Sequence, residues 1–201
     1  MVTSFDTLIN SYIDQNVGID PEFLNSTLTR QLRQHLNELF DAGALKDAGT
    51  SNNPQIQSNK LVRSDSIYWL DRKHEHPFEN AFLDLIDAFV LYLNATCYTS
   101  ITSYEFHYAR YDKGAFYSRH LDQFRNNDRR QYSMISYLND HWEEKDGGEL
   151  CIYQDNQEQL ISPMNGKMVF FKSAELEHEV KPCTQARLSI TGWLKTSAHT
   201  L

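Results

Sequence analysis

The second half of the chain is a series of short segments rich in aromatic and β-branched residues, with turn-forming sequences between them. Such segments predict β-strands, because these side chains fit a pleated, half-buried sheet. Asp-Lys-Gly at 112–114, Asp-Gly-Gly at 146–148 and Asn-Gly at 165–166 mark three of the turns. Strands are expected at 101–110, 116–122, 131–138, 149–154, 167–171, 177–181 and 187–194. About seven short strands in under a hundred residues favour a sandwich, barrel or jelly roll.

Two stretches in the first half have the hydrophobic spacing of amphipathic helices. Over 21–40, apolar residues recur every three or four positions, and Asp20 precedes them as the expected N-cap. A second helix is expected at 78–94, on the same spacing. A further strand is expected at 66–70. We therefore expect helices that buttress one face of the β-rich part.

The composition is ordinary for a soluble globular protein, with 40% hydrophobic and 23% charged residues. A length of 201 residues fits one domain. Within it, we expect residues 1–95 to provide helical support and an entrance loop, and residues 96–201 to form the β core. The sequence contains neither a recognisable signal peptide nor an apolar run that could cross a bilayer, so the expected location is the cytoplasm, with no membrane partner.

The net charge of −8 argues against a nucleic-acid partner, because binding to phosphates requires a basic surface. A local exception is the basic segment formed by Arg119, Arg125, Arg129 and Arg130. This segment is either a solvated loop or a docking surface for an acidic or peptide substrate. The three cysteines are widely spaced and form no C-x-x-C pair, which indicates neither a disulfide framework nor a thiolate zinc site.

A few polar residues in the predicted strands have the chemistry of a metal site. His120 and Asp122 are two positions apart, so on an extended strand both point to one face, about 6.6 Å apart at Cα. His178 follows 56 positions after Asp122, and Arg187 nine positions later. Two histidines and a carboxylate leave three open positions on an octahedron, which selects ferrous iron for oxygen chemistry, and an arginine fork suits the distal carboxylate of a 2-oxo acid. The remaining histidines, including His107, match no such constellation and are expected at surface or packing positions.

The order of these motifs resembles the iron- and 2-oxoglutarate-dependent dioxygenases: H-x-D, then about 55 residues, then H-E-V-x-P and R-x-x-x-T-x-W. It is most similar to the prolyl hydroxylase branch of that family. Segments 136–142 and 147–150 resemble its Y-L-N-x-x-W and G-G-x-L motifs. Segment 62–70 resembles the R-x-D-x-I-x-W sequence of oxygen-sensing and bacterial prolyl hydroxylases. The resemblance covers roughly two thirds of the chain.

The resemblance implies an α+β, mainly β protein with a double-stranded β-helix, a jelly roll whose open mouth holds the metal. It implies that His120, Asp122 and His178 bind Fe(II). It also implies that Arg187 pairs with the C5 carboxylate of 2-oxoglutarate. Further residues would contact this co-substrate: Tyr111 and Tyr137 through their phenols, Thr191 through a hydrogen bond, Leu150 as an apolar wall, and Trp193 by stacking or closing the pocket. Others would order the loop over the substrate entrance: Arg63, Asp65 and Arg130.

The activity implied by the resemblance is hydroxylation of a prolyl residue at C4 in a protein or peptide. Fe(II), 2-oxoglutarate and O2 are its cofactor and co-substrates, succinate and CO2 its co-products, and ascorbate a reductant. A translation-machinery protein is a candidate substrate. Two alternatives remain open: a hydroxylase of a free amino acid or other small molecule, and a catalytically silent 2-oxoglutarate-binding sensor. The sequence does not indicate an oligomeric state.

Overall fold

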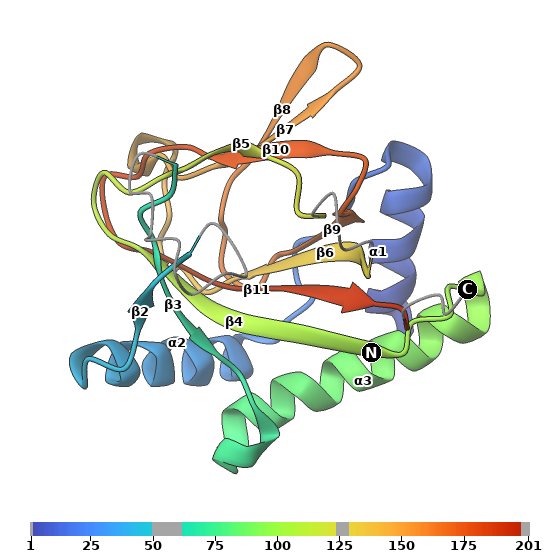
Figure 1. Ribbon diagram of the computed structural model, residues 1–201, viewed down its shortest axis with the longest axis horizontal. Helices are drawn as coiled ribbons and strands as arrows, with labels where there is room; N and C mark the ends of the chain where they lie inside the picture. The colour runs from blue at the N-terminus through green and yellow to red at the C-terminus, as the bar shows by residue number, and fades with distance from the viewer. Residues whose placement is uncertain (1, 50–61, 124–128, 198–201) are drawn as a thin grey trace.

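The computed structural model of the chain describes residues 2–49, 62–123 and 129–197. Its strands are β1 (Gly18–Asp20), β2 (Lys46–Asp47), β3 (Ser66–Trp69), β4 (Ser103–Tyr111), β5 (Tyr117–His120), β6 (Arg130–Tyr137), β7 (Leu150–Gln154), β8 (Gln157–Ile161), β9 (Met168–Lys172), β10 (Glu177–Val180) and β11 (Arg187–Lys195). They form a seven-stranded sheet, β1-β9-β6-β11-β4-β3-β2, and a four-stranded sheet, β5-β10-β7-β8. Figure 1 shows the smaller sheet stacked over the larger one. Two facing antiparallel sheets form the jelly roll that the sequence predicts.

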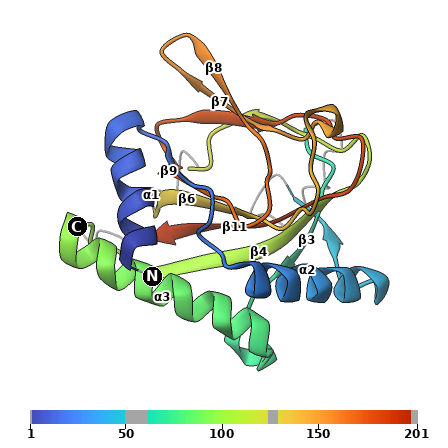
Figure 2. The ribbon, with the colours of Figure 1, turned by 180° about the vertical axis from the view of Figure 1, so that it is seen from behind.

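Helices support the larger sheet from outside. They are α1 (Val2–Gln15), α2 (Ser26–Asp41) and α3 (Pro77–Cys97), with short 3-10 helices η1 (Arg72–His74) and η2 (Glu144–Asp146). In Figures 1 and 2, α2 and α3 lie under the larger sheet, on the side away from the smaller one, and α1 stands beside β1 and β9. Among the described residues, no helix has both the length and the apolar character needed to cross a membrane.

Alternate residues of the larger sheet serve two different faces, because the side-chain period of a strand is two. On β11, Ile190 and Leu194 pack into the hydrophobic core under the helices. Arg187, Thr191 and Trp193 on the same strand line a pocket between the sheets. Strand β4 follows the same rule, with two residues in the helix-side core and two in the pocket: Phe106 and Tyr108, then His107 and Tyr111. The helices thus fix the sheet from behind and leave its other face for the site.

All of the predicted strands are present, each within two residues of its expected ends. The helix predicted at 78–94 is α3. The helix predicted at 21–40 is present as α2, but it begins later than expected. Elements that the sequence analysis did not predict are α1, β1, β2, β8 and the short 3-10 helices η1 and η2.

The N-cap predicted for α2 is wrong. The cap is Asn25, whose side chain accepts a hydrogen bond from the backbone N–H of Leu28 at 2.9 Å. Asp20 instead ends β1, where its carboxylate accepts a hydrogen bond from the Glu22 backbone N–H. Asp and Asn both favour cap positions, and Leu24 is already buried in the core before the helix begins. Apolar spacing alone therefore places the helix start too early.

Gly192 lies in β11 where the neighbouring strand β4 leaves no room for a side chain. A Cβ at this position would lie 2.2 Å from Phe106 Cδ1 and 2.3 Å from the Glu105 carbonyl oxygen. We expect Gly192→Ala to lower the free energy of unfolding by about 1–3 kcal/mol, because the sheet must shift to accept the methyl group. Chemical denaturation measures this. Gly114→Asn is the control, since Gly114 has open space and a φ of +82° that asparagine tolerates. Equal stabilities of the two variants would contradict the packing argument.

Candidate active site

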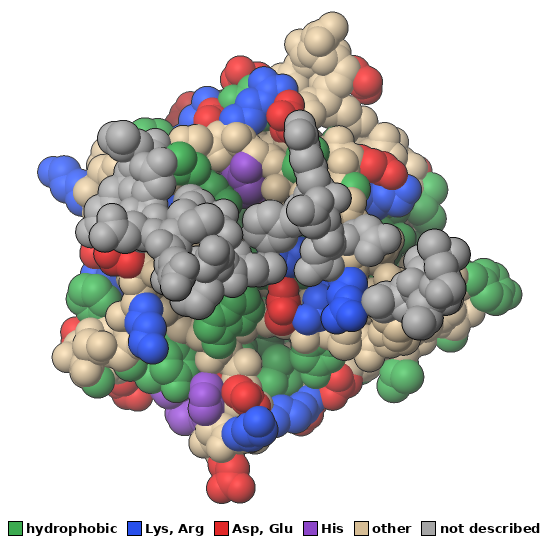
Figure 3. All heavy atoms as spheres, in the orientation of Figure 1, with side chains coloured by type: hydrophobic (Ala, Val, Ile, Leu, Met, Phe, Trp, Pro, Cys, Tyr) green, Lys and Arg blue, Asp and Glu red, His purple; other side chains and the backbone are tan. Residues whose placement is uncertain are grey.

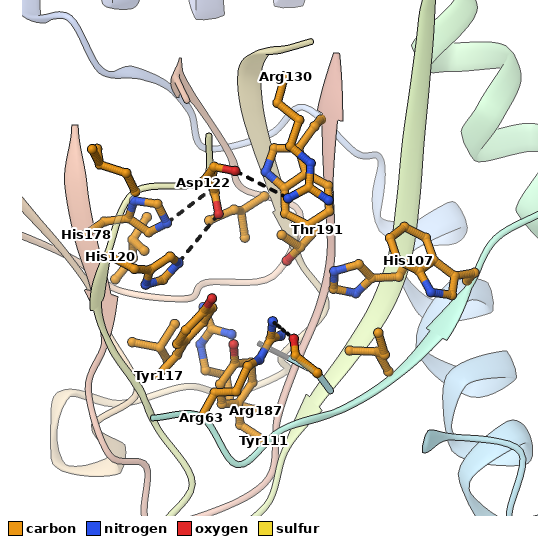
Figure 4. Close-up of a pocket in the computed structure, with 18 residues that line it drawn as sticks. Arg63, His107, Tyr111, Tyr117, His120, Asp122, Arg130, His178, Arg187 and Thr191 are labelled. Carbon is orange, nitrogen blue, oxygen red and sulfur yellow. Dashed lines mark hydrogen bonds and ion pairs between the residues drawn. The ribbon is translucent and has the colours of Figure 1, made fainter. Parts of the chain in front are cut away.

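Three potential metal ligands meet between the two sheets. His120 is the last residue of β5, and His178 lies opposite it in β10. The Asp122 carboxylate lies 3.5 Å from His120 Nε2 and 3.4 Å from His178 Nε2. Figure 4 shows the three side chains turned toward one another. Their ligand atoms lie within 4.8 Å of one another, and the described residues contain no other such group. The predicted convergence is present, although β5 ends at His120 and Asp122 lies in a bend beyond it.

Backbone carbonyls fix both imidazoles in one tautomer. His120 Nδ1 is 2.7 Å from the Ser118 carbonyl oxygen, and His178 Nδ1 is 3.1 Å from that of Leu176. A carbonyl oxygen only accepts, so each Nδ1 carries the proton and donates it. Each Nε2 is therefore left with a lone pair that faces the carboxylate. This is the orientation in which histidines bind metals.

Asp122 is held as a buried anion. It is 7% exposed, and the Ser133 hydroxyl donates a hydrogen bond to its Oδ2 at 2.7 Å. Burial alone would raise the pKa of Asp122, but His178, His120 and this hydroxyl outweigh it, so the pKa lies well below its usual range. Burial lowers the pKa of His178, which favours the neutral imidazole. A carboxylate beside neutral imidazoles is the donor set that a divalent cation requires.

The second element of the site is the guanidinium of Arg187, which is 1% exposed. Its Nε donates to the Gly148 carbonyl oxygen at 2.8 Å, and its Nη1 lies 3.4 Å from Ser189 Oγ. Among the described residues, neither its Nη2 nor the buried hydroxyl of Tyr137 has a hydrogen-bond partner. Burial raises the pKa of the Tyr137 phenol, which keeps it a neutral donor. Within the described residues no carboxylate pairs with Arg187, so these orphaned donors fit an incoming carboxylate.

A single pocket joins the ligand cluster to Arg187. Leu150, Thr191 and Trp193 line it, as the sequence analysis expects of co-substrate contacts. Tyr111 also lines it, with its ring centroid 4.9 Å from the Arg187 guanidinium carbon. The ring centroid of Tyr137 is 5.1 Å from the same carbon, although Tyr137 itself does not line the pocket. The pocket thus has the His-Asp-His cluster at one end and the Arg187 guanidinium at the other.

Of the three residues expected to order the entrance loop, Arg63 and Arg130 line the pocket at two different places, and Asp65 does not line it. The Arg63 guanidinium pairs with the Asp65 carboxylate at 2.6 Å and lies 4.2 Å over the ring centroid of Tyr117. The Arg130 guanidinium lies 3.4 Å over the Trp193 ring. Residues 50–61 and 124–128 lie outside the described ranges. The role of Arg63, Asp65 and Arg130 in loop ordering therefore stays a prediction.

Comparisons with known proteins place this site in a family. Residues 106–195 match the family described as the 2OG-Fe(II) oxygenase superfamily. The chain is similar to a Pseudomonas putida prolyl-4-hydroxylase of known crystal structure, with 32% sequence identity and a TM-score of 0.87. The match covers 96% of this chain and 100% of that one. The chain belongs to the 2OG-Fe(II) oxygenase superfamily. The family implies that the oxygenase uses Fe(II), 2-oxoglutarate and O2, and the donor set and orphaned carboxylate site described above fit the metal and the co-substrate.

Two further proteins resemble the oxygenase over most of its length. Human prolyl hydroxylase EGLN3 is 29% identical over 179 residues, which are 85% of this chain and 74% of that protein. A prolyl hydroxylase from Trichoplax adhaerens, solved with a peptide fragment of a hypoxia inducible factor, is 25% identical with a TM-score of 0.85. The match covers 95% of this chain and 88% of that one.

Several site residues of the oxygenase were missed by the sequence analysis. Tyr117 stacks on His120, with ring centroids 3.6 Å apart. Ser133 orients Asp122, and His107 lines the pocket instead of occupying the surface or packing position expected for it. Strand alternation contains a signal for His107, because it lies four residues before Tyr111 on β4 and so shares its face.

The described arginines of the basic segment do not form one continuous surface in the oxygenase. The Arg119 guanidinium is half exposed and pairs with Glu177 at 2.5 Å, whereas Arg130 lines the pocket. Arg125 lies outside the described residues. Figure 3 views the molecule from the same side as Figure 1, and on that face the described acidic and basic side chains are interspersed.

Removing the hydroxyl that holds Asp122 should weaken metal binding. Ser133 Oγ contacts both Asp122 and Ser173 Oγ inside the sheet. We expect Ser133→Ala to reduce the affinity for Fe(II) about 10- to 100-fold, because partners behind metal ligands fix their geometry. Anaerobic metal titration measures this. Ser136→Ala is the control, since Ser136 is buried on the same strand but contacts Met168 on the opposite face. An unchanged affinity in Ser133→Ala would contradict the assigned role.

Proposed function

We propose that the oxygenase hydroxylates prolyl residues at C4 within a protein or peptide, with succinate and CO2 as co-products. The observation that carries this proposal is the meeting, in one pocket, of a His-Asp-His cluster and a buried arginine with orphaned donors. The cluster suits iron, and the arginine suits the far carboxylate of 2-oxoglutarate. The likeness to a Pseudomonas putida prolyl-4-hydroxylase supports a prolyl substrate.

In this proposal His120, Asp122 and His178 hold Fe(II) through two Nε2 atoms and a carboxylate oxygen. With 2-oxoglutarate and O2, the bound metal supplies the oxidant: one oxygen atom enters the substrate C–H bond and the other enters succinate, with release of CO2. Arg187 pairs with the C5 carboxylate of 2-oxoglutarate, and the Tyr137 hydroxyl donates to the same group.

Other pocket residues shape the space around the co-substrate. Tyr111 and Thr191 provide hydroxyl groups beside it, and Leu150 provides an apolar wall that excludes water. Trp193, held under the Arg130 guanidinium, closes the side of the pocket. These assignments follow the positions predicted from the sequence.

A chain-like substrate agrees with the rim of the pocket. Trp69 and Leu121 line the pocket and are 45% and 42% exposed. Exposed apolar side chains beside a reactive centre suit contact with a peptide segment. We further propose a cytoplasmic location, ascorbate as a reductant, and a translation-machinery protein among the candidate substrates.

Mass spectrometry of treated cell extract tests the substrate class. Extract, including ribosomes and translation factors, is incubated with enzyme, Fe(II), 2-oxoglutarate and ascorbate, and peptides are searched for about 16 Da added to proline. Omission of 2-oxoglutarate and the Asp122→Asn variant are the controls. We expect a modified proline only with the complete active system. Turnover of free amino acids without any modified protein would favour the small-molecule alternative, and binding of 2-oxoglutarate without turnover would favour the sensor.

A further inference from the structure

His107 stands in a row of pocket residues that crosses the larger sheet. Trp69 pairs with His107 across β3 and β4, His107 with Thr191 across β4 and β11, and Thr191 with Ile135 across β11 and β6. All four residues line the pocket. Ile135 is 4% exposed, whereas Trp69 is 45% exposed. The row therefore leads from the interior of the pocket to its rim.

The hydrogen bonding of His107 leaves one ring nitrogen unused. Its Nδ1 is 3.0 Å from the Tyr108 carbonyl oxygen, which only accepts, so Nδ1 carries the proton. Burial lowers the pKa of His107 to about 4, so the ring is neutral at physiological pH. Its Nε2 is then an acceptor, and no described residue donates to it. Figure 4 shows the imidazole beside Thr191, within the set of pocket residues.

The surroundings of His107 restrict what can donate to this nitrogen. The ring packs against two indoles, with centroid distances of 5.0 Å to Trp69 and 5.6 Å to Trp193, and the two indoles lie 6.4 Å from each other. An unpaired acceptor in such an apolar wall is costly unless the ligand supplies a donor. The guanidinium groups of Arg63 and Arg130 face the same pocket, which disfavours a cationic donor. A neutral N–H, such as that of a peptide bond, fits both conditions.

We propose that His107 is a specificity-determining residue, whose Nε2 accepts a hydrogen bond from a backbone N–H adjacent to the target proline. Proline itself has no N–H, so the donor belongs to a flanking residue, and the contact fixes which carbon of the chain faces the metal. The proposal rests on the prolyl hydroxylase function proposed above and adds to it a residue that selects peptide over free amino acid.

Two variants of His107 distinguish the effect of losing the hydrogen-bond acceptor from the effect of changing the shape of the side chain. His107→Met removes the acceptor at similar volume, and His107→Gln keeps an acceptor oxygen. Tyr108→Phe is the control, because Tyr108 is adjacent on β4 but packs in the helix-side core with an unpartnered hydroxyl. The probes are acetylated and amidated nine-residue peptides with a central proline. Steady-state kinetics and anaerobic peptide-binding measurements are both recorded.

In His107→Met we expect KM and Kd for the peptide to rise about tenfold, the usual consequence of a lost hydrogen bond in a desolvated site. We expect kcat to change less than about twofold and KM for 2-oxoglutarate to stay unchanged. His107→Gln should recover most of the peptide affinity, and Tyr108→Phe should behave as wild type.

Backbone N-methylation of the peptide tests the contact directly. Methylating one residue beside the proline should weaken binding to wild type about tenfold and have no effect on binding to His107→Met. The proposal would be overturned if N-methylation weakened binding to His107→Met as much as it weakens binding to wild type. An unchanged peptide KM in His107→Met would also overturn it. If wild type hydroxylates none of the peptides and no protein in extract, the proposed function fails and the role of His107 fails with it.

Discussion

Asp122→Asn is expected to abolish hydroxylation, with kcat/KM reduced roughly a thousandfold or more and Fe(II) no longer retained. The amide keeps the shape of the side chain and can still accept from Ser133, but it removes the negative charge that lies between His120 and His178. Metal content after anaerobic loading and 2-oxoglutarate consumption measure the two effects.

Asp155→Asn is the matched control for that variant. Asp155 is exposed in the turn between β7 and β8 and has a φ of +50°, which asparagine adopts readily. We expect its iron content and turnover to equal those of wild type. Full metal loading of Asp122→Asn would show that the carboxylate is not a ligand.

Arg187→Met is expected to raise the KM for 2-oxoglutarate about a hundredfold or more. Losing one partner of a desolvated ion pair costs about 2–5 kcal/mol, and Arg187 is 1% exposed. Without 2-oxoglutarate the guanidinium is a buried charge lacking a carboxylate partner among the described residues. Methionine at this position should therefore leave the melting temperature of the free protein unchanged or higher.

The change in melting temperature on adding 2-oxoglutarate separates the role of Arg187 in binding the co-substrate from its effect on the stability of the free protein. In the presence of metal, we expect 2-oxoglutarate to raise the melting temperature of wild type and not that of Arg187→Met. Arg110→Met is the control, because Arg110 pairs with Asp112 and covers Phe40 on the opposite face of β4. An intact shift in Arg187→Met would contradict the carboxylate assignment.

The β core was predictable because its strands combine a period-two pattern with clear turn sequences. The turn at 112–114 and the turn at 165–166 punctuate segments whose alternate residues face the helices or the pocket. The missed elements lack such signals. In α1, polar residues interrupt the apolar stretch, and its buried residues, such as Leu8, gain their role only by packing on the sheet. β1 and β2 are too short for a period to show.

The meeting of His120, Asp122 and His178 in one pocket with Arg187 was predictable because residue type, spacing and motif order all point to one chemistry. Their supporting contacts were not, because Ser133 and Tyr117 belong to none of the motifs. Ser133 in β6 donates to Asp122, which lies beyond the end of β5, and Tyr117 stacks on His120 within β5. His107 belongs to no motif, and strand alternation from Tyr111 together with the register with Thr191 places it in the pocket. The division into a supporting part at 1–95 and a core at 96–201 stays a prediction.

The most direct test of the central assignment is anaerobic titration of the wild-type protein with Fe(II) and 2-oxoglutarate. We predict a visible charge-transfer band that saturates at one metal and one 2-oxoglutarate per chain, because His120, Asp122 and His178 leave positions at which the co-substrate can chelate the metal. The band should be lost in Asp122→Asn and require far more 2-oxoglutarate in Arg187→Met. A wild-type protein that binds no Fe(II), gives no band and consumes no 2-oxoglutarate would contradict the assignment.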